Sequence, residues 1–343
     1  MTRVLRVDAA HPDQDALTEA ARVLRAGGLV VFPTETVYGL GADAANARAV
    51  ARIYRVKGRP ADNPLILHVA TPAAARRLAE RVSPAAALAM AAFWPGPFTA
   101  VLPVAEAARP LARGMATVAV RIPNHPVALG LLAAVRIPVA APSANRSGRP
   151  SPTRAQDAVA DLVGQPVDLV LDAGSTGVGV ESTVVDFTGP VPRLLRPGGI
   201  SREELGRVLG EVLPAGSAGE EAPRSPGMKY RHYAPSCEVW LVEGNPARVP
   251  GRVRELALGE QARGRRVGVL CMAETARGMP GEVFVLGGRD DPGAQARRLF
   301  RGLRSLEGRR VELIVAEGPS GAGLGATVLD RLRRAAARVE VVP

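Results

Sequence analysis

The stretch LVVFPTETVYGLG, residues 29–41, combines a buried strand with the polar turn that follows it. Its first four residues are apolar and end at Pro33, which is the length and flank of a buried strand. Just before it, residues 12–26 have a helical pattern that stops at Gly27-Gly28, a good C-terminal signal. After the strand, two hydroxyls, a carboxylate and a phenol gather within five residues. This order predicts an α/β domain with polar groups at a strand end, and an ordinary capped turn is the alternative interpretation.

Working outward, the same signals recur over the first two hundred residues. Thr71-Pro72 opens a helix that runs to Val82, and Ser83-Pro84 opens the next, each with an N-cap hydroxyl and proline in the first turn. Ser201 with Glu204 forms a capping-box pattern for a helix near 202–210. Further strands are predicted at 65–69, 117–122, 137–141, 167–172 and 183–187. Strands mixed with helices predict an α/β or α+β domain with a mixed sheet.

The character of the chain changes at residues 214–229, which are rich in Pro, Gly, Ser, Ala and Glu and show no periodicity. This composition is typical of a linker. Beyond it, helical stretches separate strand-like runs, and the last helix is predicted at about 325–337; the runs are 238–242, 266–271, 282–286 and 311–316. The alternation predicts a second, smaller parallel α/β domain.

Composition limits the classes of function. The 343 residues are 47% apolar but only 3% aromatic, so the cores are built from Ala, Val, Leu and Ile. A net charge of +11 fits a protein that handles anions such as nucleotides or RNA. Two cysteines argue against a disulfide scaffold or a cysteine-based zinc site. Without an apolar run of membrane-spanning length or a signal peptide, the protein is expected to be cytosolic and to have no membrane contact.

Only two of the 44 basic residues are lysines, Lys57 and Lys229. Lysine is a compact charge on a flexible stem, whereas arginine is a planar fork. A lysine kept in such an arginine-rich chain suggests a tight site, although chance retention of either one alone is equally plausible. Lys57 opens the segment KGRPADNP, residues 57–64, whose two prolines predict a non-helical loop. The loop offers Lys57, Arg59 and Asn63 to one place, as a polyphosphate requires.

The predicted strand at residues 117–121 places Thr117 and Arg121 on one face. A guanidinium at the end of that face suits capture of a carboxylate or phosphate, and a surface ion pair is the alternative. His68, on the preceding predicted strand, lies five residues from Asn63. A structural and a functional role for this histidine are equally compatible with the sequence.

The segment VAAPSANRSGRPS, residues 139–151, runs from an apolar strand into a loop with three serines, one asparagine and two arginines. Small residues let a ligand approach the backbone, and the hydroxyl and guanidinium groups suit phosphate oxygens. Glu181-Ser182-Thr183 and the run that begins at Arg196 repeat the theme of polar groups at strand ends beside small residues.

Other motifs are weak or missing. No Walker loop occurs, and the four histidines lack metal-ligand spacing, so no metal site from protein side chains is predicted. Gly321, Gly323 and Ala326 spell a dinucleotide-type pattern, but the chain ends at Pro343, before the acidic partner that the pattern needs. We expect a plain strand-to-helix turn there.

Together these motifs resemble the YrdC-like threonylcarbamoyl-AMP synthase family. They are FPTETVYGLG at 32–41, KGRP at 57–60, PSAN at 142–145 with the following Ser-Gly, and ESTVVD at 181–186. SPGMKYRHYAP at 225–235 and GLGATVLDRL at 323–332 extend the likeness to the long, two-domain form. The resemblance implies a YrdC-like twisted mixed sheet with helices in residues 1–210. It also implies a linker and lid at 211–236 and a Rossmann-like parallel α/β domain at 237–343.

The resemblance also implies an activity. Such nucleotidyltransferases make threonylcarbamoyl-AMP and pyrophosphate from L-threonine, bicarbonate or CO2, and ATP, with magnesium accompanying the nucleotide. The product feeds threonylcarbamoyladenosine formation in tRNA next to the anticodon, so the tRNA-modification machinery is an expected partner and tRNA itself a possible contact. A non-catalytic RNA-binding module is the alternative, since it also explains the charge.

By resemblance, the residues expected to contact L-threonine are Thr36, His68, Arg121, Ala141 and Ser182. Those expected to contact ATP are Arg59, Asn63, Thr117, Ser143, Ser151, Arg196 and Tyr233. The residues expected at the reacting groups are Lys57, Arg59, Ser143 and Asn145. A carbamate must approach ATP, anion against anion, so catalysis is expected to depend on positioning and charge stabilisation. Residues 225–235 are expected to close over the nucleotide, with Tyr233 contacting it.

Overall fold

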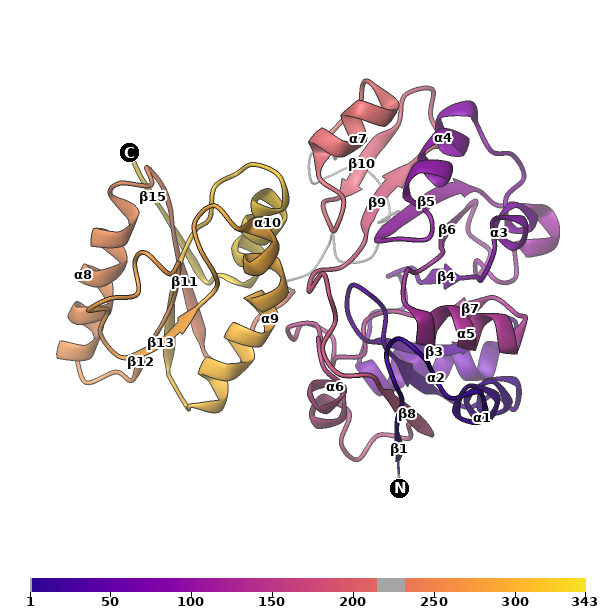
Figure 1. Cartoon of the computed structure of the whole chain (residues 1–343), viewed down its shortest axis with the longest axis horizontal. Helices are drawn as coiled ribbons and strands as arrows, with labels where there is room; N and C mark the ends of the chain where they lie inside the picture. The colour runs from indigo at the N-terminus through magenta and orange to yellow at the C-terminus, as the bar shows by residue number, and fades with distance from the viewer. Residues whose placement is uncertain (1, 215–231) are drawn as a thin grey trace. The chain divides into compact units, whose positions relative to one another are not determined.

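The computed structural model describes residues 2–214 and 232–343, which divide into two compact units. Among the described residues, the first unit comprises 2–147, 152–177 and 181–214, and the second comprises 148–151, 178–180 and 232–343. Figure 1 shows the elements of each unit in sequence colours. The predicted linker and lid at 211–236 falls mostly on residues 215–231, which lie outside the described residues.

The first unit is built on a mixed sheet, as predicted. Among the described residues its strand order is β1-β8-β2-β3-β7-β4-β6-β5-β9-β10. The pairs β1–β8, β2–β8, β4–β6 and β5–β9 are parallel, and the others are antiparallel. The strands are β1 (Arg3–Arg6), β2 (Val30–Phe32), β3 (Gly39–Asp43), β4 (Ile66–His68), β5 (Phe98–Pro103), β6 (Thr117–Arg121), β7 (Val139–Ala140), β8 (Leu169–Asp172), β9 (Thr183–Asp186) and β10 (Arg193–Arg196).

Several helices of this unit begin where a hydroxyl or amide side chain caps them. Ser201 and Glu204 form the predicted capping box, and Thr71 and Ser83 cap helices with proline in the first turn. The helix after Thr71 ends at Leu78 and not at the predicted Val82. The next residue, Ala79, is extended and forms a β-bridge with Val104, which follows β5. The helices are α1 (Gln14–Arg25), α2 (Ala47–Lys57), α3 (Pro72–Leu78), α4 (Pro84–Phe93), α5 (Pro126–Val135), α6 (Ala155–Asp161) and α7 (Arg202–Leu209), with a short 3-10 turn at Glu106–Ala108.

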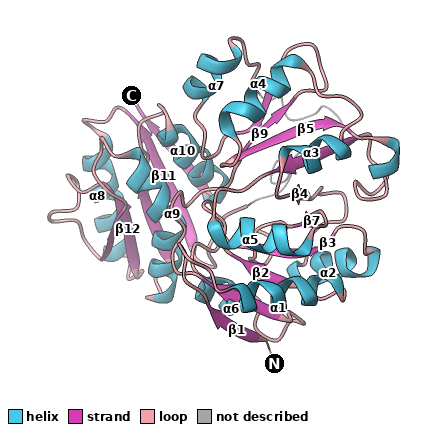
Figure 2. Cartoon of the chain, turned by 45° about the vertical axis from the view of Figure 1, so that its right-hand side comes forward, coloured by secondary structure: helices cyan, strands magenta, loops and turns pink. Residues whose placement is uncertain are grey.

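Both faces of the first sheet are covered, because successive residues of its strands point to opposite sides. In β2, Val30 and Phe32 pack with α1 and α5, while Val31 packs in a second core with residues of α2 and α4. Helices α1 and α5 contact each other and share this core, and both are labelled near β2 in Figure 2. Strands buried on both faces explain the continuous apolar run in the sequence.

The second unit contains a five-stranded parallel sheet with the order β13-β12-β14-β11-β15, which confirms the predicted parallel α/β domain. In Figure 1, α8 lies on one side of this sheet and α9 and α10 lie on the other. The alternation of strands and helices in the sequence did not predict the last strand, β15. The elements are β11 (Glu238–Gly244), α8 (Val249–Ala262), β12 (Val267–Cys271), β13 (Glu282–Val285), α9 (Pro292–Gly308), β14 (Leu313–Glu317), α10 (Leu324–Ala335) and β15 (Arg338–Val342).

Within the described residues, no helix is both long and apolar enough to cross a membrane. The glycines of the dinucleotide-type pattern lie where expected between strand and helix: Gly323 is the N-cap of α10 and has a φ of 55°.

Candidate active site

A row of polar side chains crosses the middle of the first sheet. His68 in β4 pairs with Arg121 in β6, and Arg121 pairs with Thr99 in β5. Directly paired residues in neighbouring strands project from the same face. We call His68, Arg121 and Thr99 the polar row. Sequence periodicity identified Arg121, and His68 was identified by its place on a predicted strand near Asn63. Thr99 was not identified, because β5 was not predicted.

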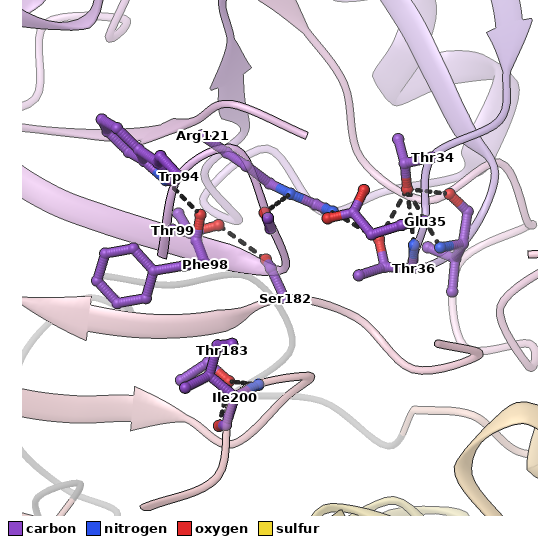
Figure 3. A network of polar contacts seen from close by, with 12 residues as sticks. Thr34, Glu35, Thr36, Trp94, Phe98, Thr99, Arg121, Ser182, Thr183 and Ile200 are labelled. Carbon is purple, nitrogen blue, oxygen red and sulfur yellow. Dashed lines mark hydrogen bonds and ion pairs between the residues drawn. The ribbon is translucent and has the colours of Figure 1, made fainter. Parts of the chain in front are cut away.

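Arg121 is the centre of this row, and it is only 4% exposed. Its Nη2 donates to Glu35 Oε1 at 2.7 Å and to Thr36 Oγ1 at 2.9 Å, and its Nε donates to Gly96 O at 3.3 Å. Figure 3 shows the guanidinium pointing at Glu35 and Thr36. The alternative of a surface ion pair is therefore wrong, because the pair is buried. In the described part of the chain no group accepts a hydrogen bond from Nη1, which leaves this amino group for an anion.

The turn after β2 is fixed by its own hydroxyl groups. Thr34 Oγ1 donates to Val37 O at 2.7 Å, and accepts from the backbone N–H of Thr36 and of Val37 at 3.2 and 3.3 Å. The Thr34 and Thr36 hydroxyls lie 2.7 Å apart. This network sets the position of Glu35 between them. Within the described residues its buried Oε2 has no partner. The sequence analysis identified the Glu35 carboxylate as part of the polar turn but did not include it among the site residues.

Ser182 joins the polar row from the loop before β9. Its Oγ lies 2.7 Å from Thr99 Oγ1, as Figure 3 shows. Arg196 Nη2 donates to Ser182 O at 2.9 Å and to Ser182 Oγ at 3.2 Å. Ser182 was expected to contact threonine and Arg196 to contact ATP, and the structure places the two side chains against each other.

His68 is buried and uncharged. Its Nδ1 lies 3.2 Å from Ile66 O, and its ring meets Phe32 edge to face at 6.2 Å. Burial, and then the nearby charge of Arg121, lower the pKa of His68 to about 3. The imidazole is therefore neutral at physiological pH and adds no further cation beside Arg121.

Lys57 does not begin a loop, as the prolines had suggested, but is the last residue of α2. The helix ends one residue later, at Gly58, whose φ of 62° is the left-handed conformation that glycine adopts easily. Lys57 is 2% exposed, and its Nζ donates to Ser143 O and Asn145 O. Burial, with help from the charge of Arg59, holds the pKa of Lys57 well below its usual range. Lys57 thus fastens the 143–145 turn to the end of α2.

Arg59 and Asn63 close the next loop. Arg59 Nη2 donates to Asn63 Oδ1 at 2.6 Å and to Pro64 O at 2.8 Å, and Nε donates to Asn63 O at 3.2 Å. Tyr54 of α2 donates to Asn63 O at 3.1 Å. The loop is thus preformed, with Arg59 folded back over Asn63.

The segment after β7 lies beside the turn that carries Thr36. Ala141 N donates to Ile66 O at 3.0 Å, and Ala144 N donates to Tyr38 O at 2.8 Å. Ser143 forms an antiparallel bridge with Gly39. These contacts bring Ala141 and Ser143 next to the polar turn. Asn145 is 5% exposed, and its Nδ2 donates to Arg146 O at 2.7 Å.

Three expected residues lie apart from this cluster or belong to the second unit. Thr117 starts β6, about 13 Å along the strand from Arg121 at roughly 3.3 Å per residue. Ser151 and Tyr233 are part of the second unit. The first unit therefore brings together the residues that are expected to contact L-threonine with Lys57, Ser143 and Arg196.

The described residues contain no group of three or more His, Cys, Asp or Glu side chains that could hold a metal ion. The groups at the polar row include the guanidinium groups of Arg121 and Arg196, the hydroxyls of Thr36 and Ser182, and the Glu35 carboxylate, which is paired with Arg121. Such a donor set suits anions rather than cations.

Two family models match the chain. One, described as "Telomere recombination", matches residues 22–198. The other, described as "Threonylcarbamoyl-AMP synthase, C-terminal domain", matches residues 200–337. A mixed-sheet domain followed by this C-terminal domain defines a class of two-domain nucleotidyltransferases.

Similar proteins cover nearly the whole chain. The threonylcarbamoyl-AMP synthase of Pyrococcus abyssi is 47% identical over 321 residues, which is 92% of each chain. That of Bacillus subtilis is 44% identical over 93% of this chain and 92% of its own. The crystal structure of P. abyssi Sua5 complexed with L-threonine has a TM-score of 0.94, 43% identity and complete coverage of both chains. The chain belongs to the threonylcarbamoyl-AMP synthase family, whose known role is in tRNA modification.

Proposed function

We propose that this chain makes threonylcarbamoyl-AMP from L-threonine, bicarbonate or CO2, and ATP, and that the polar row binds the amino acid. With bicarbonate the balance is complete: one water and one pyrophosphate leave for each product molecule. The observation that carries the proposal is the buried Arg121, whose Nη2 is tied to Glu35 and Thr36 while Nη1 lacks an acceptor among the described residues. Support also comes from the similar P. abyssi protein, which was crystallised with L-threonine.

The threonine site proposed here consists of Thr36, His68, Arg121, Ala141 and Ser182. Arg121 Nη1 binds the carboxylate, because a guanidinium amino group is the natural partner of a carboxylate oxygen. The small Ala141 leaves room for the substrate beside the strand. The Thr36 hydroxyl accepts a hydrogen bond from Arg121, and the Ser182 hydroxyl lies 2.7 Å from that of Thr99, the residue paired with Arg121 in β5. This arrangement suits a small amino acid with a hydroxyl group.

The nucleotide site is proposed to consist of Arg59, Asn63, Thr117, Ser143, Ser151, Arg196 and Tyr233. Lys57 and Asn145 set the turn that presents Ser143. Because Lys57 Nζ already donates to two backbone carbonyls, its main effect is on the position of this turn. The remaining charge in the proposed site comes from Arg59 and Arg196.

The chemistry needs a neutral amine, because an ammonium cannot attack CO2. Cations near the amine disfavour its charged form, and Arg121 is such a neighbour. The carbamate oxygen then attacks the α-phosphorus of ATP, and the bond to pyrophosphate breaks. The cations lower the repulsion between these anions, so positioning and charge stabilisation supply the catalysis. Magnesium, in this proposal, arrives bound to the phosphates of ATP and further neutralises them.

The remaining assignments follow from the reaction. The product is a mixed anhydride that the tRNA-modification machinery consumes, and we propose the cytosol as the place of reaction. Direct contact with tRNA is compatible with the net charge of +11.

Pyrophosphate release tests the activity. The purified chain is incubated with ATP, L-threonine and bicarbonate, and each is omitted in turn. Pyrophosphate is expected only when all three are present. Pyrophosphate formed without threonine, or RNA binding without any turnover, would contradict the proposal.

A matched pair of variants tests the threonine site. Thr36→Val removes the hydroxyl that accepts from Arg121 and is expected to raise the KM for threonine by about tenfold or more, since a hydrogen bond to a charged group is lost. The same exchange at the exposed Thr18 of α1 is the control and leaves the KM unchanged. If the KM for threonine is the same in both variants, Thr36 does not contact the substrate.

A further inference from the structure

One side of helix α9 meets three separate segments of the second unit. Ala296, Phe300, Arg304 and Glu307 are spaced by four, four and three residues, so they form a single stripe along the helix. We call these four residues the α9 contact face. The segments that meet it are 148–151, 178–180 and 232–236, and the first and last contain Ser151 and Tyr233.

The strongest of these contacts joins Arg149 to Glu307. Arg149 Nη1 and Nη2 donate to Glu307 Oε1 and Oε2, both at 2.6 Å. Ser236 N donates to the same Oε1 at 2.6 Å. Burial alone would raise the pKa of Glu307, but the hydrogen bonds from Arg149 and Ser236 hold it below its ordinary value. One carboxylate therefore fixes both segments.

Backbone contacts reinforce this arrangement. Arg304 donates from Nη2 to Pro150 O, which lies next to Ser151 in the chain. Ala234 N donates to Gly148 O at 2.9 Å, so the two segments are also joined to each other. The backbone on both sides of Arg149 is thus tied to α9 or to the segment after Tyr233.

Tyr233 is held by its ring. The ring stacks on Phe300 with a centroid distance of 5.3 Å and an interplanar angle of 28°. The guanidinium carbon of Arg331, in α10, lies 5.1 Å from the centroid of the same ring. Tyr233 has a φ of 67°, a conformation that is uncommon for a bulky residue and needs such surrounding contacts.

The third segment reaches the helix backbone itself. A Cβ on Gly179 would lie 2.3 Å from Arg297 Cα and 2.5 Å from Ala296 O. Only glycine permits this approach, and its φ of 83° adds to the requirement. Glu181 and Ser182 follow two and three residues later in the chain.

We propose that the α9 contact face is a positioning element for nucleotide binding, which holds Ser151 and Tyr233 in their binding-competent places. This rests on the proposed function, in which both residues contact ATP. The sequence separation of Ser151 and Tyr233 is 82 residues, and a shared helix is what fixes the two segments together. The C-terminal domain thereby acquires a role in substrate affinity although its helix supplies no group that touches the nucleotide.

The test compares Arg149→Ala and Glu307→Ala with the wild-type chain. Each is expected to raise the KM for ATP, and its Kd in equilibrium titration, by about tenfold or more, because a charged, bidentate contact is lost. The KM for threonine stays within about twofold. The double variant is expected to match the larger single effect, since both changes break one interaction.

The control pair is Arg252 and Glu340 in the same unit. Their side chains are 29% and 23% exposed, against 29% and 16% for Arg149 and Glu307, and they too form an ion pair between a helix and another segment. Arg252→Ala and Glu340→Ala are expected to leave the Kd and KM for ATP unchanged. Thermal unfolding of all variants shows whether each is folded.

The outcomes separate the two proposals. Unchanged ATP affinity in folded Arg149→Ala and Glu307→Ala overturns the positioning role, as does an equal rise in the KM for threonine. If wild-type chain binds ATP but releases no pyrophosphate, the proposed function fails, and the Kd ratios still decide the positioning role. Wild-type chain that does not bind ATP overturns both.

Discussion

The polar row of the first unit and the α9 contact face of the second hold charged groups in different ways. Arg121 is 4% exposed, and its strand pairing with His68 and Thr99 sets its place. The Arg149 side chain is 29% exposed, and a carboxylate on one helix sets its place. Sheet register determines the first arrangement and side-chain packing determines the second. Disturbing the polar row is therefore expected to affect folding and turnover together, whereas disturbing the contact face is expected to change ligand affinity.

The largest effect is expected for Arg121→Ala. The change leaves the Glu35 carboxylate buried without its cation, which typically costs about 3–5 kcal/mol of folding free energy. Threonine-dependent pyrophosphate release is expected to fall below detection, because the carboxylate partner is gone. Urea unfolding and the pyrophosphate assay measure the two effects.

A second change separates folding from turnover at the same place. In Arg121→Ala with Glu35→Gln, the buried group is neutral, so part of the lost stability should return while turnover stays absent. If Arg121→Ala alone has wild-type stability and activity, Arg121 neither supports the fold nor binds substrate.

Lys57→Met is expected to have the next largest effect. Two carbonyls, of Ser143 and Asn145, lose their donor, and an unsatisfied buried group costs about 1–3 kcal/mol. We expect a loss of about 2–4 kcal/mol in unfolding free energy, with reduced turnover because the turn that presents Ser143 is no longer fastened.

Arg55→Met is the matched control, since it removes a positive charge from the same helix at an exposed position. It should change neither stability nor turnover appreciably. If both variants behave alike, net charge rather than the fastening of the turn explains the effect of Lys57.

Local sequence signals predicted much of the fold. The apolar run before Pro33 is β2, and Ser201 with Glu204 caps α7 as expected. Strand β3 was not predicted because its sequence, GLGAD, has little strand propensity. Its pairing with β2 and β7 makes it a strand. The helical signals of α2, an asparagine N-cap and a glycine after the last turn, were present in the sequence but were not recognised.

The candidate site was less accessible to sequence reasoning. The alternation in β6 identified Arg121, but its partners Glu35 and Gly96 lie 86 and 25 residues away along the chain. The prediction that Lys57 lies in a loop was wrong, because the two prolines that exclude a helix come after Gly58, where α2 has already ended. Which residues meet across a sheet depends on strand order, and no local pattern specifies that order.

The smallest effect concerns His68 and is read from pH dependence. Its pKa is about 3 in the folded chain and 6.5 ordinarily, so between these values the unfolded state binds more protons. Stability should therefore fall as pH drops below about 6.5, by up to about 1.4 kcal/mol per pH unit from this group. His68→Asn removes this contribution, and urea unfolding at pH 7, 6 and 5 compares the slopes. Identical slopes in both proteins would mean that His68 takes up its proton over the same pH range in the folded and unfolded states, and the lowered pKa of His68 would then be excluded.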